Sequence, residues 1–314
     1  MILWVIGAGG LFGSALCRAA RVRGDQVFTS TAVPWGDVQA TEAHLRRDAT
    51  LLSEVIAASP QPWAIVWAAG AATTATSPPA CAGELAAFEL WATVIDRTLS
   101  HHGGGIFFLT SSAGGVYAGS EGAPFDSRTD PAPLGDYGKL KLDQERLARH
   151  LLGDHMTVIV GRVGNLYGPG QDTSKLQGLI SRLCLASITR ETLTMFVPLD
   201  TLRDFIYVDD AAALALHWID TATPEFRVRV IASGMPTSLG HVIAVTHDVV
   251  RRPIPIAHGF HPSARAQAHD LRLTPDADPA TELLVHTPLP VGIRAVFLDL
   301  LERQARSDVR SRAR

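Results

Sequence analysis

The chain has 314 residues, which is long enough for two domains or one large one and for a sizeable buried core. Hydrophobic residues make up 46% of the chain and charged residues 19%, the balance of an ordinary globular protein. The net charge of −3 gives no electrostatic reason to expect nucleic acid or an anionic membrane surface as a partner.

The apolar segments do not predict membrane insertion or secretion. The longest apolar runs, such as 106–109 (IFFL) and 158–160 (VIV), are far shorter than the ~20 residues of a membrane span. The first six residues, MILWVI, lack the basic start and the cleavage site of a signal peptide. We therefore expect a cytoplasmic protein without a membrane partner.

The cysteines and histidines do not predict a metal site. The 3 cysteines, Cys17, Cys81 and Cys184, are far apart and fit neither a disulfide nor a metal pattern. We expect all of them to be small buried residues in a reducing compartment, and no metal.

Strands alternate with helices in the first half of the chain. Apolar runs predict strands at 2–6, 26–30, 63–67, 106–110 and 156–160, and helical patterns lie at 14–23, 51–58, 85–99 and 139–152. This alternation, with unbroken apolar strands, predicts an α/β fold whose parallel sheet is covered on both faces.

A glycine-rich loop follows the first expected strand. Gly7, Gly10 and Gly13 have the spacing G-x-x-G-x-x-G, with Gly9 as an extra glycine. Glycines allow a tight turn and a close backbone approach to a pyrophosphate, which a helix N-terminus attracts. An ordinary strand–helix turn is the alternative, but the position between the first strand and a helix favours dinucleotide binding and a Rossmann-type doubly wound sheet.

The choice between NAD and NADP stays open. The end of the second strand, 27–31 (VFTST), has no acidic residue to hold the ribose 2′-hydroxyl of NAD. The hydroxyls there can serve either cofactor, and Arg18 or Arg23 could reach the 2′-phosphate of NADP, so we slightly prefer NADP. Asp48 precedes the expected helix 51–58, where it is either an N-cap or a contact to the cofactor.

The pattern changes after Asn165, where loops rich in Gly and Pro divide the chain into short pieces. A helix is expected over 209–219, and a strand over 228–232 that returns to the main sheet. We expect a dinucleotide-binding domain over 1–165 plus about 205–233 and a smaller irregular α/β substrate-binding region over 166–204 plus 234–302. A flexible basic tail, 303–314, follows.

Tyr137 and Lys141 lie four residues apart in an expected helix, which places both side chains on one face. An ammonium beside a tyrosine favours the phenolate, so the pair can exchange a proton with an alcohol or ketone. The spacing alone is common by chance, and its weight comes from the motifs around it.

Five stretches occur in order along the chain, namely the glycine loop, 110–112 (TSS), the Tyr137–Lys141 pair, 162–169 (RVGNLYGP) and 203–210 (RDFIYVDD). This order resembles the extended short-chain dehydrogenases/reductases, and more closely the NAD-dependent epimerase/dehydratase family, which acts on nucleotide sugars. The resemblance implies an enzyme with NAD or NADP as cofactor, a nucleotide-sugar substrate and a homodimer.

The resemblance also implies the roles of individual residues. Tyr137 is the acid/base, Lys141 holds the nicotinamide ribose, and Ser112 hydrogen-bonds the reacting oxygen. In the family the hydroxyl often stands three residues before the valine, whereas Ser112 stands four residues before Val116. The neighbouring Ser111 is therefore kept as an alternative for the catalytic hydroxyl. The implied cofactor contacts are Gly7, Gly10, Leu11, Phe12, Gly13, Asp48, Ala68, Ala69, Gly70, Ser111, Tyr137, Lys141 and Val163.

On the substrate side, the resemblance implies contacts from Ser112, Asn165 and Arg203, whose guanidinium suits diphosphate oxygens. A salt bridge to Asp204 or Asp209 is the alternative for Arg203. Tyr117, Tyr167 and Tyr207 are expected to be packing residues.

The residues also limit the reaction. A 4,6-dehydratase needs a carboxylate pair after the Ser/Thr, where Ala113 and Gly114 stand, and a 3,5-epimerase needs a further acid/base, for which Cys81 is the only candidate. We therefore expect a 4-epimerase, with an NADPH-dependent 4-ketoreductase as alternative. A non-catalytic dinucleotide-binding protein is a lesser alternative, because such proteins usually lose the Tyr or the Lys.

Overall fold

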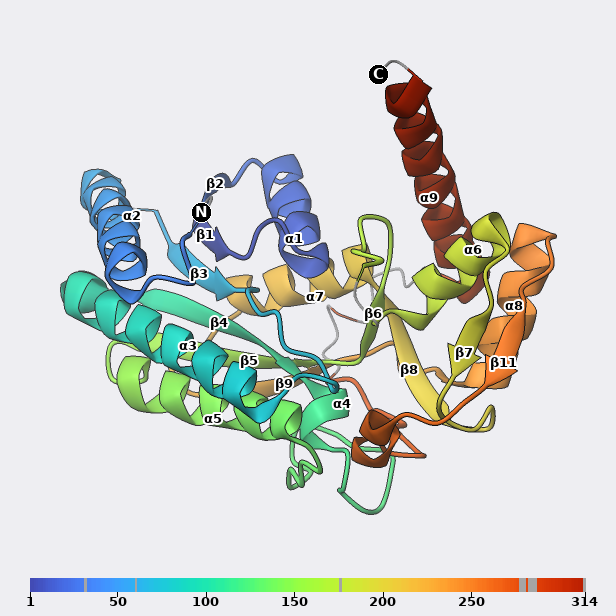
Figure 1. The fold of residues 1–314 in the computed structure, drawn as a ribbon. Coiled ribbons are helices and arrows are strands. Elements are labelled where there is room, and N and C mark those ends of the chain that lie inside the picture. The colour runs from blue at the N-terminus through green and yellow to red at the C-terminus, as the bar shows by residue number, and fades with distance from the viewer. Residues whose placement is uncertain (31–32, 60, 175–176, 277–280, 282–286, 313–314) are drawn as a thin grey trace.

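Six parallel strands form the central sheet of the computed structural model, which describes the chain except residues 31–32, 60, 175–176, 277–280, 282–286 and 313–314 (Figure 1). Their order is β2-β1-β3-β4-β5-β9, and every neighbouring pair is parallel. The strands are β1 (Ile2–Ile6), β2 (Gln26–Thr29), β3 (Trp63–Trp67), β4 (Gly105–Ser112), β5 (Met156–Val163) and β9 (Arg227–Ile231).

Helices cover both faces of this sheet (Figure 1). One face carries α2 (Val38–Ala58), α3 (Pro78–Leu99) and α5 (Asp136–Leu152), and the other carries α1 (Leu11–Val22) and α7 (Val208–Asp220). Side chains of β1 alternate between the two layers, so that Trp4 packs with the first set and Leu3 and Val5 with the second. Strands β1 and β3 are apolar and buried along their whole length because both faces of the sheet are covered.

A smaller region lies beside the carboxyl ends of the central strands (Figure 1). Its sheets have the orders β10-β8-β6 and β11-β7. The elements are α4 (Ala113–Val116), β6 (Asn165–Tyr167), α6 (Leu179–Thr189), β7 (Leu193–Met195), β8 (Leu202–Tyr207), β10 (Pro236–Ser238), α8 (Leu239–Val250), β11 (Ile256–His258) and α9 (Leu289–Arg312), with 3₁₀ turns at Ser100–His102 and Pro262–Ala266. Leu183, Val242 and Ile293 join α6, α8 and α9 in a separate core.

The structure confirms the expected α/β class with a doubly wound parallel sheet and a smaller region. All five strands expected for the first half of the chain are present, and β9 returns to the sheet beside β5 as expected. The domain boundaries stay predictions.

Three expected limits are wrong by more than one turn, and one of them is the start of α3, which begins at Pro78 rather than Leu85. The second helix begins at Val38 rather than Leu51, because the side chain of Asp37 accepts a hydrogen bond from the Ala40 N–H and caps it. Helix α9 continues to Arg312, into the stretch 303–314 expected to be a flexible tail. The i,i+4 ion pairs Arg303–Asp299 and Arg306–Glu302 support this helix where it leaves the core.

None of the helices in the described parts of the chain combines the length and hydropathy that a membrane crossing requires. Nor do the described residues contain a group of three or more His, Cys, Asp or Glu that could hold a metal ion. The prediction that the three cysteines are buried is confirmed: Cys17, Cys81 and Cys184 are buried and form no disulfide, and burial raises the pKa of Cys184 to about 12.

The central core sets the stability of the fold. Phe107 on β4 is fully buried, with its ring centroid 5.1 Å from that of Trp91. We expect Phe107→Ala to lower the free energy of unfolding by about 3–5 kcal/mol, because it leaves a cavity among rigid neighbours. Chemical denaturation measures this. Val22→Ala, at a site 89% exposed, is the control with an expected change within about 0.5 kcal/mol. Equal losses in both variants would contradict the core assignment.

Candidate active site

The glycine loop brings the first helix unusually close to the sheet. Gly7 has φ +86°, and a Cβ there would lie 2.5 Å from the backbone nitrogen of Ala69 on the loop after β3. A Cβ on Gly13 would lie 2.3 Å from the carbonyl oxygen of Gly7. Both positions therefore require glycine. The packing leaves the N-terminus of α1, which begins at Leu11, open for an anionic group.

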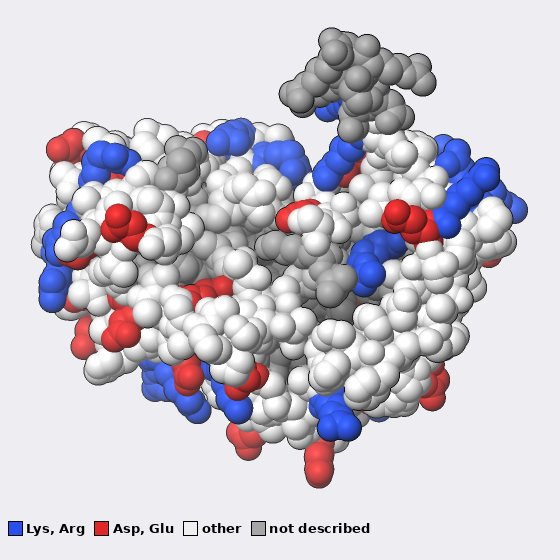
Figure 2. Space-filling model, viewed as in Figure 1, with Lys and Arg blue, Asp and Glu red and all other residues white. Residues whose placement is uncertain are grey.

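A cavity of about 510 Å³ extends from this helix end to the smaller region. Figure 2 shows a hollow between the two parts of the molecule, with basic and acidic side chains scattered on the face around it. Its walls include the predicted residues Gly10, Leu11, Ala68, Gly70, Ser111, Ser112, Tyr137, Val163, Asn165 and Arg203. One continuous space thus joins the candidate cofactor residues to the candidate substrate residues.

Tyr137 and Lys141 lie on one face of α5, as their spacing predicts. Tyr137 lines the cavity, and the Lys141 Nζ lies 5.8 Å from the centroid of its ring. Lys141 is buried, and its ammonium donates to Gln144 Oε1 at 3.0 Å and to Glu84 Oε1 at 3.3 Å. Nζ also lies 3.4 Å from the position that a Gly70 Cβ would take. Lys141 therefore lies directly behind the part of the wall that Gly70 forms.

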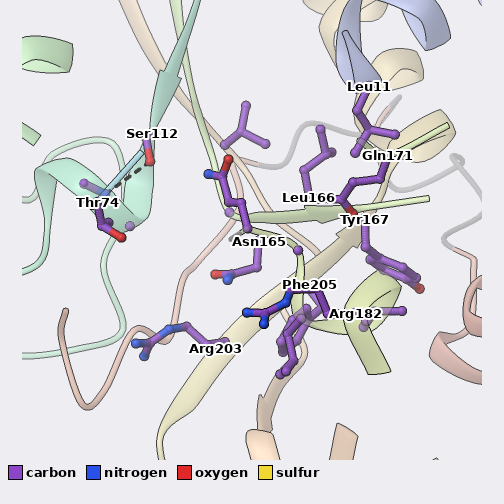
Figure 3. Close-up of a pocket in the computed structure, with 18 of the residues that line it drawn as sticks. Leu11, Thr74, Ser112, Asn165, Leu166, Tyr167, Gln171, Arg182, Arg203 and Phe205 are labelled. Atoms are coloured by element: carbon purple, nitrogen blue, oxygen red, sulfur yellow. Dashed lines mark hydrogen bonds between the residues drawn. The ribbon is translucent and has the colours of Figure 1, made fainter. Parts of the chain in front are cut away.

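The two serines at the end of β4 have different surroundings. The Ser111 hydroxyl is buried and donates to Glu145 Oε1 at 2.5 Å. Ser112 caps α4, where its Oγ accepts a hydrogen bond from the Gly115 N–H at 3.1 Å. Ser112 lies at the cavity wall, to which Thr74 also contributes (Figure 3). In that bond Ser112 Oγ is the acceptor, so its O–H can still donate to a ligand, whereas the O–H of Ser111 already donates to Glu145. Ser112 is therefore better placed than Ser111 to bind a ligand.

A buried ion pair lies beneath these serines. Arg162 on β5 donates to Glu145 on α5, with Nη2 2.7 Å from Oε2 and Nε 3.1 Å from Oε1. Arg162 also donates to the hydroxyl of Tyr117 at 2.8 Å, and that hydroxyl donates to the Asp126 carbonyl at 2.7 Å. Tyr117 is therefore a packing residue as expected, and the pair links helix α5 to strand β5.

The substrate side of the cavity contains Asn165 and Arg203, on the neighbouring strands β6 and β8. Figure 3 shows both side chains in the pocket, with Arg182 of α6 nearby. The described partners of the Arg203 guanidinium are the Leu202 carbonyl and Gln267. The alternative partner Asp209 pairs instead with Arg18 at 2.7 Å. Burial lowers the pKa of Arg203 to about 10, which leaves the group cationic at neutral pH.

The surroundings of Asp48, and of Arg18 and Arg23 as candidate ligands of a 2′-phosphate, differ from those expected. Asp48 lies inside α2 rather than at a helix start, so the N-cap alternative is wrong. Its carboxylate accepts from the hydroxyl of Ser30, just after β2, at 2.7 Å. Both arginines form ion pairs with the chain's own carboxylates: Arg18 with Asp209, and Arg23 with Asp25 and Asp220.

Of the other predicted cofactor residues, Phe12 buries its side chain in the core under α1, and Ala69 packs against the core of the opposite face. The sequence patterns did not indicate several further wall residues, namely Thr74, Gln171, Arg182 and Gln267. These residues lie mostly at strand ends or in irregular loops, where no periodicity marks them.

The profile of the family described as "NAD dependent epimerase/dehydratase family" matches residues 3–232. Among curated proteins, dTDP-L-rhamnose 4-epimerase of Burkholderia thailandensis is 28% identical over 114 residues, which are 36% of this chain and 31% of that protein. The dTDP-6-deoxy-L-talose 4-dehydrogenase (NAD(P)(+)) of Kitasatospora kifunensis is 29% identical over 159 residues, 48% of this chain and 49% of that protein. The chain thus aligns with half or less of the length of these relatives.

A solved structure matches far more of the chain. The UDP-glucose 4-epimerase of Thermotoga maritima, determined with UDP-glucose, has a TM-score of 0.78 at 19% identity. The match covers 97% of this chain and 100% of that one. At this identity the likeness shows the shared fold.

The buried ion pair generates a prediction about stability. Glu145→Gln leaves the Arg162 cation buried without its counter-ion, and we expect the free energy of unfolding to fall by about 3–5 kcal/mol. The double variant Glu145→Gln/Arg162→Met should recover part of this loss, because neither charge remains. Glu42→Gln breaks an exposed pair with Arg46 and is the matched control, expected within about 0.5 kcal/mol. A loss for Glu145→Gln no larger than for Glu42→Gln would refute the role of the pair.

Proposed function

The chain belongs to the NAD dependent epimerase/dehydratase family, and on this premise we propose that it is an NAD-dependent enzyme that oxidises and reduces a carbinol carbon of a nucleotide-activated sugar. We favour a 4-epimerase. The observation that carries the proposal is the continuous cavity, which has the open helix end and Tyr137 on one side and Arg203 on the other.

The residues present fit a dinucleotide. The close contacts of Gly7 and Gly13 leave room for a pyrophosphate at the N-terminus of α1, and Gly70 leaves the wall beside Lys141 without a side chain. A bound nicotinamide would supply the acceptor and donor of hydride. We prefer NAD to the NADP that the second strand favoured, because Arg18 and Arg23 are held in ion pairs.

The roles of the chain's own residues follow from their positions. Tyr137 would take the proton of the sugar hydroxyl as the hydride leaves the same carbon, and would return it on reduction. Ser112 would donate a hydrogen bond to that oxygen, and Lys141 would hold the cofactor ribose. Asn165 and Arg203 would hold the diphosphate side of the substrate. Asp48 is proposed to contact the adenine end from its place beside Ser30.

Two related reactions are disfavoured. Ala113 and Gly114, which follow Ser112 at the start of α4, have no acid/base groups for dehydration. Cys81 is buried, and burial raises the pKa of its thiol, with Glu84 and Asp136 adding to the effect, so it is unsuited to 3,5-epimerisation.

The second candidate is a 4-ketoreductase that exchanges NADPH, since one relative is a 4-dehydrogenase with NAD(P)(+) in its name. A non-catalytic dinucleotide-binding role is the lesser candidate. The homodimer and the cytoplasmic location expected from the sequence stay predictions.

The experiment that tests the proposal assays the purified chain with NAD against a panel of UDP- and dTDP-hexoses, with product epimers separated by chromatography. Tyr137→Phe should lower the turnover by about 10²–10⁴-fold, because the proton acceptor is lost, while NAD binding stays within threefold. Tyr207→Phe is the matched control, since Tyr207 does not line this cavity. Turnover only with added NADPH and a keto sugar would select the reductase. Binding of NAD without turnover of any sugar would select the non-catalytic role.

The proposed clamp has a separate test. Arg203→Ala should weaken binding of UDP by about 10–100-fold, because a charge-assisted hydrogen bond to phosphate is lost. Binding of uridine should change little. Isothermal titration measures both, and Arg128→Ala, at an exposed arginine, is the control. Equal weakening of UDP and uridine would remove Arg203 from the diphosphate site.

A further inference from the structure

A carboxylate that no sequence motif indicated lies beside the catalytic pair. Glu84 is in the first turns of α3, and its Oε1 lies 3.3 Å from the Nζ of Lys141. The two side chains are only 13% and 8% exposed, so solvent screens the pair weakly.

The other carboxylate oxygen of Glu84 binds the loop that follows β3. Glu84 Oε2 accepts hydrogen bonds from the backbone N–H groups of Ala71 and Ala72, each at 2.8 Å. These residues directly follow Gly70 in the loop after β3, and Gly70 lines the cavity. A single side chain thus joins α3, the end of β3 and the lysine of α5.

The pair lies directly behind Gly70. A Cβ on Gly70 would stand 2.9 Å from Glu84 Oε1 and 3.4 Å from Lys141 Nζ, and Gly70 itself lines the cavity. Gly70 therefore forms the wall between the pair and the cavity, and it has no side chain to keep a ligand at a distance. The Lys141 ammonium has three N–H donors, and within the described chain two acceptors are in place, on Glu84 and Gln144. One donor is left for a ligand hydroxyl.

The charges around this point have an electrostatic consequence. Oxidised nicotinamide carries one positive charge on its ring and reduced nicotinamide carries none. The Lys141 cation alone would disfavour the oxidised ring, and the Glu84 carboxylate opposes that effect. Of the carboxylates on α5, Asp136 is 44% exposed on its side chain and faces Lys139 at 3.4 Å, and buried Glu145 is paired with Arg162 at 2.7 Å. Glu84 is therefore the buried carboxylate that pairs with Lys141.

We propose that Glu84 is a positioning residue that holds Lys141 behind Gly70 and that, by its charge, makes the site prefer oxidised over reduced nicotinamide. The inference rests on the proposed function, because it requires that a nicotinamide dinucleotide binds in this cavity. An enzyme that must start from the oxidised cofactor benefits from this preference.

The test measures the dissociation constants of NAD⁺ and NADH on the full chain, stripped of nucleotide, by isothermal titration. Glu84→Gln keeps an oxygen for Ala71 and Ala72 but removes the charge, and we expect the ratio Kd(NAD⁺)/Kd(NADH) to rise by about tenfold. Glu89→Gln makes the same change at an exposed site on the same helix and should leave the ratio unchanged within twofold. A purely structural role of Glu84 would weaken both nucleotides equally.

A second pair of variants covers the case in which Glu84→Gln does not fold. Glu84→Asp and Glu84→Asn have equal length and differ in charge alone, and the Asn variant should have the higher ratio. A ratio that is the same with and without the charge overturns the role of Glu84, while the measured binding of NAD leaves the proposed function intact. If the wild-type chain binds neither nucleotide, the proposed function fails, and the role of Glu84 fails with it.

Discussion

The buried Glu145–Arg162 pair is the constraint on which the arrangement of the site depends. It joins α5, the helix that carries Tyr137 and Lys141, to β5, which lies between β4 and the edge strand β9. Two charges cost much free energy to bury, and they are stable only with good geometry and further hydrogen bonds, which Ser111 and Tyr117 supply. Rotation of α5 about its axis would break several of these bonds together, so the pair fixes which face of the helix meets the cavity.

The remaining parts of the site are brought together by the topology of the sheet. The carboxyl ends of parallel strands lie on one edge, and here β1, β3, β4 and β5 end beside the cavity. The glycine loop, Gly70, Ser112 and Val163 follow from four separate strands, yet all line the same space. Rigid elements thus position groups that an enzyme must hold within fractions of an ångström. The same packing places a second carboxylate, Glu84, against the lysine.

The sequence allowed prediction of those features that depend on local patterns. Unbroken apolar runs identified the strands, the glycine spacing identified the first loop, and the one-turn spacing of Tyr137 and Lys141 placed them on one face. Glu84 escaped prediction because its partners, Lys141 and the N–H groups of Ala71 and Ala72, are brought to it only by tertiary folding. The start of α2 was missed because its cap, Asp37, lies in a loop rich in turn residues. The helical end of α9 was missed because a run of arginines is equally typical of a solvated tail.

The central claim is that hydride leaves a sugar carbon for a nicotinamide held in this cavity, and the fate of an isotopic label tests it most directly. The purified chain is given NAD and a nucleotide hexose that carries deuterium on the carbinol carbon, and the mixture is quenched within one turnover and after many. The account predicts deuterium on the nicotinamide in the early sample and full retention in the final epimer. Loss of deuterium to water, with none on the nicotinamide at any time, would contradict it.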